Sequence, residues 1–192
     1  MKRNKIIQIF ILCSIIITTS ISFAWFADKD IKTNSFIGSV KISNIENFTP
    51  PENWDGTSYE KNVVIKNTGK SDSLVRVSLV SRWVDKHENP FSGDTSIVKF
   101  TPENPRNWIN GNDGYYYYNK ILTSGESTTP LLEEVSLDLT NLSEEEKNLY
   151  EDKQLIVDVN SECIQATEEA FNSAWTTFSP DIKTTLEGLC SK

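Results

Sequence analysis

The sequence predicts an all-β protein, and we expect a jelly-roll-like antiparallel β-sandwich with a few short helices. Two observations support this expectation. Apolar and polar residues alternate along several stretches of the chain, which is the period of a strand with one buried face. Clusters of Gly, Asn, Pro and Ser separate these stretches at short intervals, which is typical of turns between the strands of a sandwich.

The clearest alternation lies in residues 75–83 and 155–159, where one parity is apolar and the other mostly polar. Side chains of one parity share a face of a strand, so we expect both strands to bury one face. Cys163 continues the parity of Leu155 and is expected to point toward the core. The same pattern predicts further strands at 36–42, 62–66, 115–122 and 131–139.

Three short segments carry helix signals. Ser143 precedes a glutamate by three residues, which resembles a capping box and predicts a helix within 143–151. Residues 167–175 consist largely of helix-forming residues and place two aromatic side chains four positions apart on one face. Ser179 followed by a proline is typical of a helix start and predicts a helix from 180 to about 186.

The first 24 residues predict a secretory signal peptide. Three basic residues precede an apolar stretch that ends near residue 17, and Ser22-Phe23-Ala24 fits the small-x-small cleavage rule. We expect the mature chain to begin within a residue of Trp25, after Ala24 or a neighbour, with an uncleaved N-terminal anchor as the alternative. The apolar stretch is shorter than the roughly 20 residues of a membrane span, so no stable membrane anchor is expected. These features predict a secreted protein, in the extracellular matrix or on the cell surface.

The acidic composition excludes one class of partner. Removal of residues 1–24 leaves 168 residues, the size of one domain, and takes away three basic residues and no acidic one. The formal charge then moves from −8 to −11. Such a surface repels the phosphates of nucleic acids, so we expect no nucleic-acid partner.

Two cysteines remain after export, since Cys13 lies in the predicted signal peptide. An even number of cysteines in an exported protein predicts a disulfide, here between Cys163 and Cys190. This bond would tie the C-terminal tail, 176–192, to the last long strand. The alternatives are two cysteines that form no disulfide, or a disulfide between two molecules.

The sequence carries no recognisable catalytic or metal-binding motif. His87 is the single histidine, and it lies beside Glu88 in a turn-like stretch. No H-E-x-x-H, G-x-S-x-G or glycine-rich phosphate loop is present. We therefore expect a protein that is not an enzyme, with no catalytic residue, no metal site and no cofactor.

The start of the predicted mature chain resembles the TasA/camelysin family. The motif is Trp25-Phe26-Ala27-Asp28, followed by Asn34-Ser35-Phe36-Ile37-Gly38 and an alternating strand. Three further stretches resemble its clostridial BsaA-like branch: 59–69 with 75–77, 114–128, and 164–175. Proteins of this family are exported by Gram-positive bacteria and processed by a SipW-type signal peptidase, which the resemblance implies as a partner here.

The resemblance implies a structural subunit of biofilm-matrix fibres with a jelly-roll-like fold. In such fibres the N-terminal segment of one subunit adds as a strand to the next, so the main partner is a second copy of the chain, with other matrix components besides. The donor segment would be 25–34 and the sandwich domain 35–175. The residues expected to act in strand donation are Trp25, Phe26, Asp28, Ile31, Asn34 and Phe36. Charged residues 28–30 are expected to keep the segment from folding back onto its own subunit.

Three alternatives stay open. The mature N-terminus could be disordered rather than a donor strand. A secreted camelysin-like metalloprotease would depend on His87 for its metal. A fibre-anchoring adhesin would expose an aromatic face made of the four tyrosines 115–118 together with Trp108.

Overall fold

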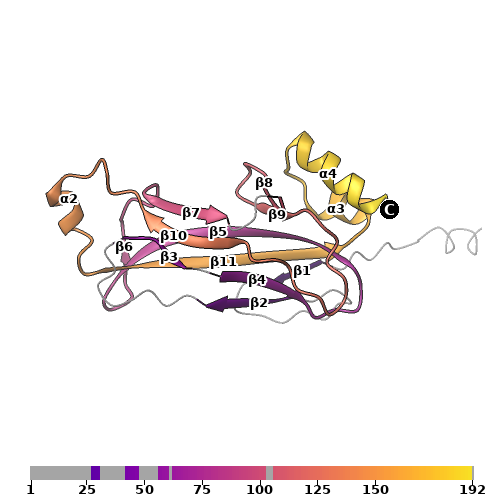
Figure 1. Ribbon diagram of the computed structural model, residues 1–192, viewed down its shortest axis with the longest axis horizontal. Coiled ribbons are helices and arrows are strands. Elements are labelled where there is room, and N and C mark those ends of the chain that lie inside the picture. The colour runs from indigo at the N-terminus through magenta and orange to yellow at the C-terminus, as the bar shows by residue number, and fades with distance from the viewer. Residues whose placement is uncertain (1–26, 31–41, 48–55, 61, 103–105, 192) are drawn as a thin grey trace, which may run out of the picture.

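The computed structural model describes residues 27–30, 42–47, 56–60, 62–102 and 106–191. Within these ranges the chain is mainly antiparallel β-structure with three short helices (Figure 1), which confirms the prediction of an all-β protein with few helices. The predicted signal peptide and several predicted donor residues lie outside the described residues; these are 1–24, Trp25, Phe26, Ile31, Asn34 and Phe36. No helix of the described part is long and apolar enough to cross a membrane.

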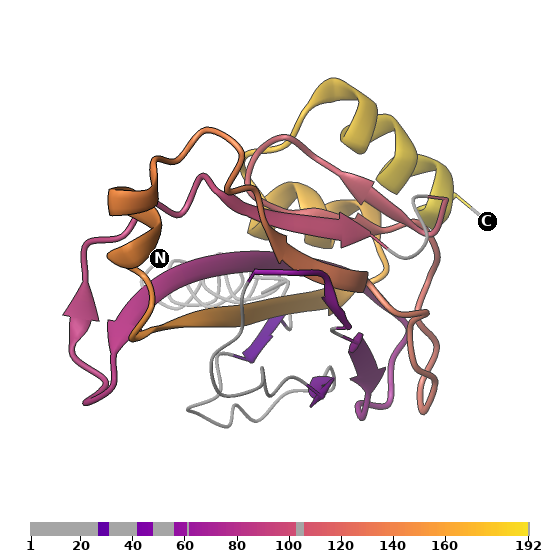
Figure 2. The ribbon, with the colours of Figure 1, turned by 60° about the vertical axis from the view of Figure 1, so that its left-hand side comes forward.

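The largest sheet has six strands. Its central pair is β5 (Ser73–Asp85) and β11 (Lys153–Gln165), which run antiparallel and pair over all 13 residues of each. The sheet order is β1-β11-β5-β9-β8, and β6 pairs with one end of β5. The bounds of the remaining four strands are β1 Ala27–Asp30, β6 Pro90–Phe91, β8 Trp108–Asn110 and β9 Tyr116–Tyr118. Figure 2 shows the β5–β11 pair as a long, curved ribbon.

Two smaller sheets complete the β-structure. One has the order β3-β10-β7, with β3 at Tyr59–Glu60, β10 at Leu132–Leu137 and β7 at Val98–Pro102. The other pairs β2 (Ile42–Asn47) with β4 (Asn62–Asn67). The chain that leads into β10 runs beside β4, because Leu131 donates its N–H to the carbonyl of Val63 at 2.8 Å.

The main apolar core contains buried residues from all three sheets. The side chains of strands β1 and β2 are not described. The odd-numbered residues of β5 and β11 face this core, as the alternation of the sequence predicts. Cys163 is among them and is fully buried, so its expected direction is confirmed. The members from these two strands are Val75, Val77, Trp83, Leu155, Val157, Val159 and Cys163.

A second apolar cluster covers the opposite face of the same sheet. Leu74 and Ile164 have the other parity and pack with residues of two C-terminal helices, α3 (Glu168–Ala174) and α4 (Pro180–Cys190). Both helices lie at the end of the β5–β11 pair where β11 finishes (Figure 1). Residues 176–192 were predicted as a tail, and most of them form α4, which buries Ile182 and Leu186 in this cluster.

The predicted disulfide between Cys163 and Cys190 is not formed in the structure. Cys163 belongs to the main core, whereas Cys190 packs against the second cluster. Neighbouring residues of a strand point to opposite faces, so the contact of Ile164 with the helical side directs Cys163 away from it. Apolar packing therefore holds the C-terminal segment on the sheet where a covalent bond was expected.

The three helices begin where the sequence predicts. Ser143 forms a reciprocal capping box with Glu146 at the start of α2 (Glu144–Asn148). Thr167 and Ser179 cap α3 and α4 through their side-chain oxygens. Helix α4 extends to residue 190 rather than 186, because Leu189 and Cys190 also pack against the second cluster.

Candidate strand-addition site

The edge of the six-stranded sheet is formed by β1, the described part of the predicted donor segment. It pairs antiparallel with the last residues of β11, in a register that runs from Ala27 opposite Ile164 to Asp30 opposite Ser161. This strand spans four residues, whereas β11 spans 13. Its described residues pair with one end of that strand.

The sequence led us to expect that charged residues would keep this segment off its own subunit. The structure instead pairs Ala27–Asp30 with β11 of the same chain. Strand pairing uses main-chain N–H and C=O groups, which every residue except proline supplies, so charged side chains do not prevent it.

Backbone groups of alternate residues in β11 point to opposite sides. The N–H of Ala166, just past the strand, donates to the carbonyl of Asp72 at 3.0 Å, so even-numbered residues bond toward β5. The N–H of Lys153 donates instead to Tyr150, which lies outside β5. Odd-numbered residues thus direct their N–H and C=O groups toward the side on which β1 lies.

Further along β11, two more residues direct their main-chain groups to the side on which β1 lies. Leu155 and Val157 are odd-numbered, so their main-chain groups point to the side on which β1 adds, while their side chains are buried in the core. Among the described residues, no strand pairs with 153–158 on this side. A row of main-chain donors and acceptors at a sheet edge is a template for strand addition.

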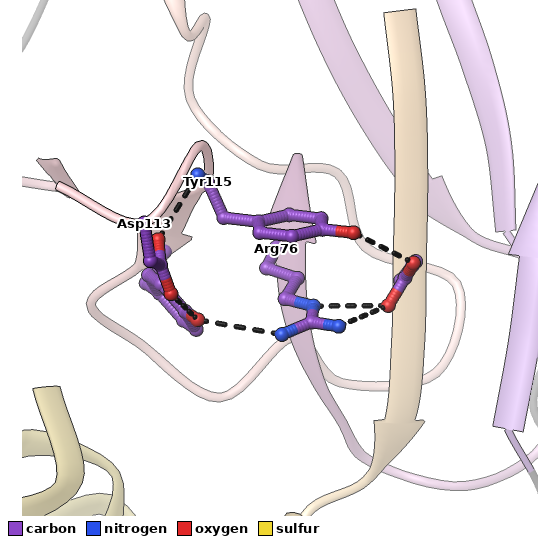
Figure 3. A network of polar contacts seen from close by, with 5 residues as sticks. Arg76, Asp113 and Tyr115 are labelled. Atoms are coloured by element: carbon purple, nitrogen blue, oxygen red, sulfur yellow. Dashed lines mark hydrogen bonds and ion pairs between the residues drawn. The ribbon is translucent and has the colours of Figure 1, made fainter. Parts of the chain in front are cut away.

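An ion pair lies on the outer face of the sheet, next to the residues that carry β1. Arg76 of β5 and Glu162 of β11 stand directly opposite each other. Nε and Nη2 of Arg76 donate to the same oxygen, Oε2 of Glu162, at 2.9 and 2.7 Å (Figure 3). The side chains are only 8% and 13% exposed, so water screens this pair far less than a surface pair.

Aromatic residues complete the surroundings of this pair. The hydroxyl of Tyr115 donates to Oε1 of Glu162 at 3.2 Å, as Figure 3 shows. The Cζ atom of Arg76 lies 3.9 Å from the ring centroid of Tyr115 and 4.7 Å from that of Trp175, which follows α3. Cation–π contacts with two rings stabilise the charge of Arg76 in this buried place.

A second tyrosine links the ion pair to the turn between β8 and β9. Tyr117 donates its hydroxyl proton to Oδ2 of Asp113 at 2.7 Å and accepts a bond from Nη1 of Arg76 at 3.4 Å. Burial, and then the hydrogen bond to Asp113, raise the pKa of Tyr117, so the hydroxyl stays protonated. Gly111 is needed here, because an added Cβ would lie 2.6 Å from both Asp113 Oδ1 and Tyr117 Cε2.

We call Arg76, Glu162, Asp113, Tyr115, Tyr117 and Trp175 the buried ion cluster. The sequence did not predict it, because Arg76 and Glu162, which form its ion pair, lie 86 positions apart in the chain. The sequence does contain one signal. Arg76 and Glu162 are charged residues on the polar parity of two strands with clear alternation, and they lie equally far from the paired ends of β5 and β11. Parity alone gives that face, but not its burial by Trp175.

The alternative functional residues lie elsewhere. His87 is exposed in a turn organised by Asp85, whose Oδ1 accepts the N–H groups of His87 and Asn89 at 2.8 and 2.9 Å. Within the described ranges, no three His, Cys, Asp or Glu residues lie close enough to hold a metal ion. Of the residues in the alternative aromatic face, Trp108, Tyr117 and Tyr118 are each at most 5% exposed and belong to the apolar clusters, whereas Tyr115 and Tyr116 are half-buried.

Comparison with known proteins returned no family model, no curated protein and no solved structure that matches the chain. Two features of the molecule therefore bear on its function. One is the set of sequence motifs at the N-terminus and along the strands. The other is the geometry of the β11 edge and of the groups beside it.

Proposed function

We propose that this chain is a secreted, non-enzymatic structural subunit of extracellular biofilm-matrix fibres. Its N-terminal segment would add as a strand to the sheet of the neighbouring subunit. The proposal includes a jelly-roll-like sandwich, export through the signal peptide at 1–24, and processing by a SipW-type peptidase. It draws on the resemblance to the TasA/camelysin family and on the sheet edge.

The observation that carries the proposal is that β1, the described part of the predicted donor segment, pairs with β11 at the edge of the largest sheet. The four residues of β1 pair with one end of the 13-residue β11, and the main-chain groups of Leu155 and Val157 face the same side. Exposed strand edges favour association with other chains unless they are covered. An N-terminal strand from a second copy is the simplest partner, because β1 already shows that this segment pairs with this edge.

Pairing within one chain and pairing between chains are two forms of the same contact. Each main-chain hydrogen bond contributes only about 0.5 to 1.5 kcal/mol net, so a four-residue strand is released at small cost. When the segment pairs with the next subunit instead, the same bonds form again, as in domain swapping. Because the contact is head-to-tail and does not close on itself, repetition produces a filament.

The first test removes the donor segment. A chain that starts at residue 35 should give a folded monomer by circular dichroism and no filaments by negative-stain electron microscopy. The chain that starts at Trp25 should form filaments under the same conditions. Filaments that persist without residues 25–34 would overturn the proposal.

The second test asks in which molecule the strand is paired. Asp28 lies directly opposite Cys163 in the register, so Asp28→Cys places two cysteines at paired positions, within the Cα separation a disulfide requires. In a Cys190→Ser background, oxidation during assembly should give a ladder of covalent oligomers that collapses on reduction. Asp28→Ser is the matched control. A monomer cross-linked only to itself would contradict strand donation.

A further inference from the structure

The sequence of β1 does not by itself determine its register on β11. The strand reads Ala-Asp-Lys-Asp, with no alternation of apolar and polar residues. A slip of two residues keeps every side chain on the same face, so the burial pattern penalises it little. Short polar strands are weakly specified for this reason. Another interaction must select the observed pairing.

The observed register brings together two residues of opposite charge. Lys29, the one basic residue of β1, stands directly opposite Glu162. Glu162 is also the one acidic residue in 159–165 of β11. A slip of two residues in either direction would place Lys29 opposite Asn160 or Ile164 instead. Opposite charges at directly paired positions stabilise an antiparallel pair.

The protein holds Glu162 in place. Arg76 donates two hydrogen bonds to it and Tyr115 donates a third, and the side chain is 13% exposed. Because three hydrogen bonds hold the carboxylate and Arg76 itself packs against Trp175, the charge of Glu162 is fixed and weakly screened. A fixed charge in a poorly hydrated place discriminates between registers better than a mobile one.

We propose that Glu162, positioned by Arg76 and Tyr115, is the register-determining residue for strand addition at this edge. It selects a strand of a second copy of this chain that carries Lys29 opposite it. The use of this selection in fibres rests on the proposed function. The register on β11 is a property of the edge itself and applies to pairing within one molecule as well.

The other acidic residue on the outer face of β11 does not perform this role. Asp158 lies four residues away and pairs with Arg82 at 2.8 Å, but the two side chains are 46% and 52% exposed. Water and salt screen a charge of this kind. Asp158 therefore provides a matched control on the same strand and the same face.

Two cysteine reporters measure the register. The native-register reporter is Asp28→Cys opposite the native Cys163. The slipped-register reporter combines Asp28→Cys with Ser161→Cys and Cys163→Ser, since residue 28 meets residue 161 after a slip of two. Both carry Cys190→Ser. The yields of disulfide after mild oxidation, counted within and between molecules together, give the ratio of native to slipped register.

The variants separate a register role from a purely structural one. Lys29→Gln should lower the ratio about five-fold, which corresponds to the upper range of a cross-strand charge pair. Glu162→Gln should lower it similarly, Lys29→Arg should restore it, and Asp158→Asn should leave it unchanged. An unchanged ratio in Lys29→Gln, or an equal fall in Asp158→Asn, would overturn the inference. So would a fall in Glu162→Gln alone, because that pattern indicates a structural role.

The same experiment keeps the two proposals apart. Disulfides that form only within one molecule refute assembly by strand donation, and the ratio still tests the register. Disulfides between molecules with a ratio that Lys29 does not affect support assembly and refute the role of Glu162.

Discussion

The β5–β11 pair carries two Arg–carboxylate ion pairs on its outer face, and these two ion pairs differ in strand register and in burial. Arg76 and Glu162 are direct cross-strand partners, with side chains 8% and 13% exposed. Arg82 and Asp158 are diagonal neighbours, since Arg82 stands opposite Ile156, and they are 52% and 46% exposed. Their shortest N–O distances are nearly equal, at 2.7 and 2.8 Å.

The N–O distance therefore does not determine how much such a pair contributes to stability. The burial of its side chains does. The C-terminal segment places Trp175 over Arg76 and closes one end of the sheet face with α3 and α4. At the other pair, no described residue makes a ring contact with Arg82. A buried pair is costly to break by removal of one partner, whereas an exposed pair contributes about 0 to 1 kcal/mol.

The largest expected effect separates the two pairs by truncating each arginine. Arg76→Met removes the buried cation that donates two hydrogen bonds to Glu162 and should lower the free energy of unfolding by about 3 to 5 kcal/mol. Arg82→Met should lower it by less than about 1 kcal/mol. Urea denaturation followed by circular dichroism measures both.

A double variant shows whether charge is the cause. Arg76→Met combined with Glu162→Leu removes both charges and should recover most of the lost stability, since apolar pairs often replace buried ion pairs without loss. If the double variant is as unstable as Arg76→Met alone, lost packing rather than an uncompensated charge explains the effect. Equal losses in Arg76→Met and Arg82→Met would remove the distinction between the two regions.

A smaller effect is expected from crowding the buried ion cluster at its edge. Gly111→Ala forces a methyl group to 2.6 Å from Asp113 and Tyr117 and should cost about 1 to 3 kcal/mol. Gly188→Ala is the matched control, because nothing lies within 4 Å of its added Cβ and the residue is inside α4. That change should raise stability by about 0.5 to 1 kcal/mol. Thermal or urea unfolding that gives both changes the same sign would contradict the assignment.

The contrast between the two pairs also marks what the sequence could predict. Strands β5 and β11 followed from alternation, and the helix starts followed from Ser143, Thr167 and Ser179, because these signals are local. Strands β6 and β8 have two and three residues and were not predicted, since such short strands depend on a partner elsewhere in the chain. The predicted disulfide is not formed. Strand parity predicts that Cys163 points into the core, but it does not predict where the helix that carries Cys190 packs.

The candidate site was predicted only in part. Sequence motifs pointed to residues 25–34, and the structure shows their described part, Ala27–Asp30, at a sheet edge. The edge itself could not be foreseen, since it depends on which strands pair with β11. The position of Lys29 opposite Glu162 could not be predicted either. The register pairs residues more than 130 positions apart through main-chain hydrogen bonds, and these carry no sequence signature.

The smallest expected effect concerns salt. Asp158→Asn should cost less than about 1 kcal/mol at low ionic strength, and the difference from the parent chain should vanish in about 1 M NaCl, where the screening length is about 3 Å. Glu162→Gln should keep most of its cost in the same salt, because the neighbouring rings and helices exclude the screening ions. Unfolding midpoints at two salt concentrations measure this. If salt removed both differences alike, the cover over Arg76 would not shield its charge, and register selection by a fixed carboxylate would lose its physical basis.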